Sequence, residues 1–165
     1  MSEYHRPIMV EEVLEGLDIR PGGIYFDGTA GGGGHSFAIL ASDPTVHLIA
    51  TDKDEDAIKE VTQRLSPYAG RFKLYRTDFK NYQEVFSDAG VGQIDGYLLD
   101  LGISSHQIDT SSRGFAYMSD DAPLDMRMDN RASLTAEAVV NEYSEDALLR
   151  ILRDYGEETF APSIV

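Results

Sequence analysis

Residues 24–36, with the sequence IYFDGTAGGGGHS, decide the fold that this chain can adopt. The apolar run at 24–26 follows a Pro-Gly-Gly turn at 21–23 and predicts a short buried strand that leads into Asp27. The glycines at 31–34 let the backbone adopt positive φ and let a ligand approach the main chain closely. A helix is predicted over residues 36–40, so the stretch comprises a strand, a glycine loop and a helix.

Strands and helices alternate on both sides of this stretch. Apolar runs predict further strands over residues 47–51, 72–75 and 94–101. Amphipathic periodicity predicts helices over residues 9–17, 54–65 and 82–89, and Asp54 is placed to cap the second of them. The β-α-β-α-β-α-β order predicts an α/β fold with a mainly parallel sheet and helices on both faces. A polar loop over residues 102–130 and two amphipathic helices, over 134–143 and 145–155, follow in this prediction.

Composition narrows the class of protein. The chain has 165 residues, with 14 Lys and Arg against 29 Asp and Glu, and a net charge of −15. This excess of acidic residues excludes general electrostatic binding of nucleic acid by the whole surface, because such binding depends on Lys and Arg at phosphates. With 0 Cys and 4 scattered His, neither a disulfide nor a metal site is expected. The polar N-terminus and the lack of a long apolar run favour a cytoplasmic protein with no membrane contact.

An acidic residue stands at or just after the end of each of the four predicted strands. They are Asp27, Asp52, Asp78 and Asp100. In a parallel sheet the carboxyl ends of the strands lie at one edge, and ligands of such folds bind there. One such acid would mean little, since Asp is common in caps and turns, but four at one edge favour a binding site.

The glycine loop departs from two known phosphate-binding patterns. No Lys-Ser or Lys-Thr pair follows the glycines, which excludes the phosphate-binding P-loop. The dinucleotide pattern G-x-G-x-x-G fits at Gly31 and Gly33, but its third position is Ser36. A nicotinamide-dependent oxidoreductase is therefore disfavoured, and a flexible βα turn without a ligand stays open as the alternative.

Asp52 lies roughly 20 residues beyond the loop, where a carboxylate accepts hydrogen bonds from the ribose hydroxyls of an adenosine. The alternative is that Asp52 only caps the helix that begins nearby. Together with a loop that lacks phosphate-binding chemistry, Asp52 favours an adenosine cofactor without a pyrophosphate. S-adenosylmethionine is the candidate that fits.

Six motifs carry a resemblance to a known family. They are HRPIM at 5–9, DGTAGGGGHS at 27–36, LLDLGISSHQ at 98–107, RGF at 113–115, PLDMRM at 123–128 and YGEETFA at 155–161. The chain resembles the bacterial methyltransferases that modify N4 of a cytosine in small-subunit (16S) ribosomal RNA, and the resemblance spans nearly the whole sequence. It implies a Rossmann-like class I methyltransferase fold, S-adenosylmethionine as cofactor and small-subunit ribosomal RNA as substrate.

The resemblance also implies the residues that bind the cofactor. They are the loop residues Gly33, Gly34 and His35, the ribose-binding acid Asp52, Phe79 beside the adenine, Asp100 at the end of the fourth strand, and Gln107 after it. His106 stands where the family usually has Pro, which leaves the reach of Gln107 open.

Asp100 is also the candidate catalytic residue. The N4 amine of cytosine is a poor nucleophile because its lone pair is delocalised into the ring. Alignment with the methyl donor and a nearby acceptor for the amine proton would both lower the barrier. Asp100 stands near the end of the fourth strand, where both the cofactor and the target amine are within reach in this prediction.

Family members are about twice as long as this chain, which ends inside their helical insertion. We therefore expect residues 1–110 to form the N-terminal part of the methyltransferase core and residues 111–165 to begin the insertion. The sheet is expected to be incomplete, which leaves the edge of the fourth strand open and favours self-association of the chain. The alternative to an enzyme half is a non-catalytic fragment that binds the cofactor or a partner.

Overall fold

The computed structural model describes residues 7–165, so His5 of the first motif lies outside the described residues. The chain divides into two compact units, one that ends at His106 and one that spans Gln107–Val165. Each unit is described by itself. Among the described residues no helix is both long and apolar enough to cross a bilayer.

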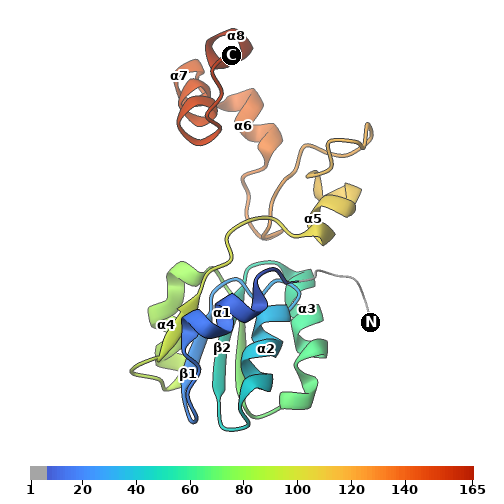
Figure 1. Cartoon of the computed structure of the whole chain (residues 1–165). Helices are drawn as coiled ribbons and strands as arrows, with labels where there is room; N and C mark the ends of the chain where they lie inside the picture. Colours follow the sequence, from blue (N-terminus) through green and yellow to red (C-terminus); the bar gives the residue numbers. More distant parts are fainter. Residues whose placement is uncertain (1–6) are drawn as a thin grey trace. The chain divides into compact units, whose positions relative to one another are not determined.

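The first unit contains a four-stranded parallel sheet in the order β3-β2-β1-β4 (Figure 1). Its strands are β1 (Ile24–Asp27), β2 (His47–Asp52), β3 (Phe72–Arg76) and β4 (Gly96–Leu98). The predicted parallel sheet is confirmed. In its register Asp27 lies beside Ala50 of β2 and Leu98 of β4.

Four helices connect and cover these strands. They are α1 (Val10–Leu17), α2 (Gly34–Ser42), α3 (Glu55–Arg64) and α4 (Tyr82–Ala89). In Figure 1, α4 lies on the opposite side of the strands from α2 and α3. Two short 3₁₀ helices, Ser66–Tyr68 and Phe79–Asn81, lie before β3 and after it.

Alternation of side chains along the strands produces two hydrophobic cores. Tyr25 and Leu48 are buried with Ile39 of α2 on one face of the sheet. The next residues along β1 and β2, Phe26 and Ile49, are buried with Val85 of α4 on the other. Successive side chains of a strand point to opposite faces, so helices cover both faces as predicted.

The connections reverse direction between β1 and β4. From β1 the chain moves outward to β2 and β3, and it then returns to place β4 on the other side of β1. In open α/β sheets the crevice at such a reversal, outside the carboxyl ends of the strands, is where ligands bind. The glycine loop follows β1 at this point.

The fourth strand is shorter than the predicted 94–101. It pairs only with β1, whose last paired residue is Asp27, opposite Leu98. Because the chain turns into the glycine loop after Asp27, β4 has no ladder partner beyond Leu98. The strand is at the edge of the sheet, and Tyr97 in it is 68% exposed.

The second unit consists of helices and loops. The prediction of a continuous polar loop over residues 102–130 was wrong in part. That segment contains a short helix, α5 (Ser105–Asp109), which straddles the boundary between the units, and a 3₁₀ turn at Ser111–Arg113. The elements that follow are α6 (Ala136–Glu142), α7 (Glu145–Arg150), a π-helical turn (Ile151–Tyr155) and α8 (Ala161–Ile164). The helix predicted over 145–155 therefore changes its winding at Ile151, and α8 was not predicted.

Candidate cofactor site

The carboxyl ends of the strands form a rim that is tied together by the glycine loop. The Gly31 N–H donates to Asp52 Oδ2 at 2.8 Å. Thr29 Oγ1 accepts from the Asp100 N–H at 2.7 Å. Hydrogen bonds from one loop thus reach the ends of β2 and β4, and the loop, Asp52 and Asp100 are neighbours in the first unit.

Glycine is needed at Gly33 and at Gly34 of the loop for different reasons. Gly33 has φ +74°, a left-handed conformation that glycine adopts without steric cost. At Gly34, which begins α2, a Cβ atom would lie only 2.6 Å from Pro7 Cγ. The backbone at the start of α2 is therefore closely packed by Pro7, and only a residue without a side chain fits.

Asp52 is held by two backbone donors. In addition to Gly31, the Asp54 N–H donates to Asp52 Oδ1 at 2.9 Å. The side chain that caps α3 is that of Asp54, which accepts from the Asp56 N–H, so the cap explanation for Asp52 is wrong. Burial is the main cause that raises the pKa of Asp52 above its usual value, and the two N–H groups oppose it. A half-buried, oriented carboxylate at this position is suited to accept hydrogen bonds from a diol.

Asp27 does not face the rim. It is buried, accepts from Ser36 Oγ at 2.6 Å and accepts from the Thr29 N–H at 3.1 Å. Asp27 thus lies beneath the loop, where its hydrogen bond to Ser36 connects the end of β1 to the first turn of α2. Burial raises the pKa of the Asp27 carboxyl to about 6, against the opposing effect of these hydrogen bonds.

The raised pKa of Asp27 predicts a pH-dependent difference between the wild-type chain and Asp27→Asn. A carboxyl that titrates near 6 when folded and near 3.8 when unfolded binds more protons when folded, so its contribution to stability falls as pH rises through this window. An Asn side chain keeps an acceptor for Thr29 and gains a donor for Ser36. We expect the stability of Asp27→Asn relative to wild type to increase by about 1 kcal/mol between pH 5 and pH 7. Urea unfolding at several pH values measures this, and parallel curves for the two chains would contradict it.

Asp100 and His35 face each other across the loop. His35 Nε2 lies 3.8 Å from Asp100 Oδ2. His35 is in the first turn of α2 and is buried, whereas the Asp100 side chain is 41% exposed. The Asp100 carboxylate is therefore available to solvent and to a ligand while its backbone is tied to the loop.

Phe79 supplies apolar surface near the end of β1. It begins the 3₁₀ turn after β3 and packs with Phe26 and Val85. A Cβ atom on Gly28 would lie 2.9 Å from Phe79 Cβ and 2.4 Å from Leu99 Cδ2. Glycine at 28 thus lets Phe79 and Leu99 come close to the start of the loop, and the rim combines an apolar side chain with carboxylates.

Comparison with known proteins places this chain in a family. A profile of the MraW methylase family matches residues 2–165. The chain belongs to this family. It is 49% identical over 166 residues to ribosomal RNA small subunit methyltransferase H 2 of Agathobacter rectalis, with 99% of this chain and 52% of that protein covered. It is 47% identical over 165 residues to ribosomal RNA small subunit methyltransferase H of Symbiobacterium thermophilum, with the same two shares covered.

The chain thus spans about half the length of the curated relatives it matches. Among solved structures it resembles the C-terminal domain of precorrin-6Y C5,15-methyltransferase from Rhodobacter capsulatus, with a TM-score of 0.50 and 16% identity over 66% of this chain and 56% of that chain. That likeness concerns the fold alone. The expected family and the Rossmann-like methyltransferase fold are both confirmed.

Six of the seven residues expected to bind the cofactor in this MraW-family chain lie in the first unit. They are Gly33, Gly34, His35, Asp52, Phe79 and Asp100. Gln107 is buried in α5 and belongs to the second unit, so its place relative to the other six is not described. Thr29 was missed by sequence reasoning, although its place two residues after Asp27 is typical of a turn held by an Asp side chain.

The RGF and PLDMRM motifs of the MraW-family chain have a structural role in the second unit. Arg113 donates to the backbone oxygens of Arg127 and Met128, each at 3.0 Å. Arg127 pairs with Asp125 at 2.6 Å, and its Nη1 donates to the Ala132 carbonyl at 2.7 Å. These arginines hold the loop before α6 in place.

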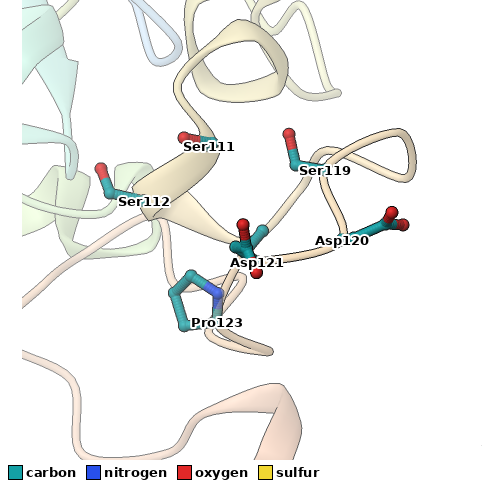
Figure 2. A pocket seen from close by; sticks show the side chains of 7 residues that line it. Ser111, Ser112, Ser119, Asp120, Asp121 and Pro123 are labelled. Atoms are coloured by element: carbon teal, nitrogen blue, oxygen red, sulfur yellow. The ribbon is translucent and has the colours of Figure 1, made fainter.

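A hollow of about 400 Å³ lies in the same unit. Its lining consists of Ser111, Ser112, Ser119, Asp120, Asp121, Ala122 and Pro123. Figure 2 shows the hydroxyl groups and the two carboxylates around it. No basic side chain lines this hollow, so it is unsuited to phosphate groups.

Proposed function

We propose that this chain is the N-terminal half of an enzyme that transfers a methyl group from S-adenosylmethionine to the N4 amine of a cytosine in small-subunit ribosomal RNA. Family membership and the names of its relatives support methyl transfer to ribosomal RNA. The observation that carries the proposal is the Asp52 carboxylate, which two backbone N–H groups orient beside the glycine loop.

The residues present fit this cofactor. Asp52 would accept hydrogen bonds from the ribose hydroxyls, Phe79 would lie against the adenine, and loop residues 33–35 would contact the methionine part. Glycine at 28 lets Phe79 approach the start of the loop, and glycine at 34 lets the chain at Pro7 pack against the start of α2. Bound S-adenosylmethionine supplies an electrophilic methyl group on sulfur.

Asp100 would act on the target amine. Its carboxylate is partly exposed next to β1 and β4, where the connections between strands reverse direction. Its backbone N–H is hydrogen-bonded to the loop. It would accept a hydrogen bond from the N4 amine, hold the amine in line for attack, and take up its proton as the new N–C bond forms.

The substrate contact would use surface other than the arginines of the second unit. The guanidinium of Arg113 donates to backbone oxygens, and those of Arg127 and Arg131 pair with Asp125 and Asp129. With a net charge of −15, the chain does not offer a general basic surface. We propose that much of the RNA-binding surface lies in the part of the relatives that this chain does not span.

The experiment that tests this function has two arms. Calorimetric titration of the 165-residue chain with S-adenosylmethionine and with NAD is expected to give binding of the first only. Transfer of a tritiated methyl group to small ribosomal subunits is then measured with a full-length relative, and the Asp100→Ala variant is expected to lose about 100-fold or more in rate, the size of a general acid–base contribution. Normal transfer by the variant would remove Asp100 from catalysis, and binding of NAD instead would overturn the proposal.

A second candidate function is a non-catalytic fragment that binds the cofactor or a partner. The observation that favours it is the exposed edge strand β4, in which Tyr97 is 68% exposed. Leu101, beyond the end of this strand, is also 68% exposed, and the chain spans about half of its relatives. Binding of S-adenosylmethionine without methyl transfer, even when the rest of the sequence is supplied, would favour this candidate. Self-association through the same edge stays a prediction.

A further inference from the structure

Hydrogen bonding between the segments of β1 and β4 continues beyond the end of the sheet, where a side chain replaces a backbone acceptor. The last backbone bond of this pair runs from the Gly28 N–H to the Leu98 carbonyl at 3.0 Å. Two residues later, the Asp100 N–H donates to Thr29 Oγ1 at 2.7 Å. The Thr29 hydroxyl therefore takes the place of a backbone acceptor where β1 turns away into the loop.

Thr29 is itself held by the buried side chain of Asp27. Its N–H donates to Asp27 Oδ1 at 3.1 Å, and Asp27 Oδ2 accepts from the Ser36 hydroxyl at 2.6 Å. Asp27 and Ser36 are both buried. A continuous series of hydrogen bonds thus runs from the first turn of α2, through the end of β1, to the backbone of Asp100.

We propose that Thr29 is a positioning residue for Asp100. The proposal rests on the proposed function, because the role of Asp100 is part of it. Asp100 follows an edge strand of only three residues, and its neighbours Leu99 and Leu101 are 37% and 68% exposed. Thr29 ties the backbone of this exposed segment to the loop, so that the Asp100 carboxylate stays beside His35 and the loop.

The hydrogen bond is tested first, without ligand, by amide hydrogen exchange of the 165-residue chain. In Thr29→Val the Asp100 amide is expected to exchange about fivefold faster, as the loss of one hydrogen bond predicts, whereas Thr29→Ser retains the protection. Thr51→Val is the matched control, because Thr51 Oγ1 donates to the Gly28 carbonyl at 3.1 Å but does not bond Asp100. Unchanged exchange of the Asp100 amide in Thr29→Val would overturn the proposal.

The positioning role is tested by affinity for S-adenosylmethionine in two backgrounds, because Asp100 is expected to contact the cofactor as well as the target amine. Thr29→Val is expected to weaken binding about fivefold in the wild-type background and not at all in the Asp100→Ala background, and Thr29→Ser is expected to bind like wild type. Equal weakening in both backgrounds would show that Thr29 acts on the loop alone and would overturn the role. If the unsubstituted chain binds no S-adenosylmethionine, the proposed function fails and this role with it, whereas failure of the double-variant test alone affects only Thr29.

Discussion

Replacing Asp52 by Ala is expected to weaken the binding of S-adenosylmethionine about 100-fold or more. Two hydrogen bonds from ribose hydroxyls to a carboxylate would be lost, and bonds to charged groups are each worth about 1.5–3 kcal/mol. The variant also frees the Gly31 and Asp54 N–H groups, which Asp52 now holds at 2.8 and 2.9 Å. Calorimetric titration of the folded variant, checked by circular dichroism, measures the loss.

Asp43→Ala is the matched control for Asp52→Ala. Asp43 also accepts a local backbone hydrogen bond, from the Thr45 N–H at 2.7 Å, but it lies before β2, at the opposite end of that strand. We expect Asp43→Ala to bind the cofactor like wild type. An Asp52→Ala chain that is folded and retains its affinity would show that the adenosine does not bind at this rim.

Gly114→Ala is expected to destabilise the second unit by about 3 kcal/mol or more. Gly114 has φ +76°, which costs a residue with a side chain about 1–2 kcal/mol. Its Cβ atom would also lie 2.3 Å from the Pro123 carbonyl oxygen and 2.7 Å from the Asp125 N atom. Because both are backbone atoms, the loop held by Arg113 would have to open. Hydrogen exchange resolved by segment measures the effect over residues 111–132.

The control for Gly114→Ala is Gly22→Ala. Gly22 has φ +74°, but nothing lies within 4 Å of the position that its Cβ atom would take. Gly22→Ala is therefore expected to cost only the conformational energy of about 1–2 kcal/mol. If the two variants lower stability equally, the close contact at Gly114 does not contribute, and the packing of the loop against Pro123 is looser than described.

The fold of the first unit was predictable because its signals are local. The run at 24–26, the turn before it and the glycines after it define β1 and its loop without reference to any other segment. The predicted helix at 82–89 matches α4. The end of β4 was not predictable in this way, since it depends on where its partner β1 leaves the ladder rather than on the apolar residues Leu99 and Leu101.

The outline of the site was predictable from the sequence, but one detail of the prediction was wrong. Strand ends placed Asp52 and Asp100 at one rim, and the structure ties both to the glycine loop. The same reasoning placed Asp27 with them, but the Ser36 hydroxyl and burial draw its carboxyl beneath the loop. The bond between Thr29 and Asp100 joins residues 71 positions apart, so no local pattern reveals it.

Pro7 packs against Gly34, where α2 begins at the end of the glycine loop. The described part of the chain therefore begins next to the proposed cofactor site. A substitution of Pro7 would change the packing at the start of α2 and alter the apparent affinity for the cofactor. Reporter groups for binding studies are better placed away from Pro7.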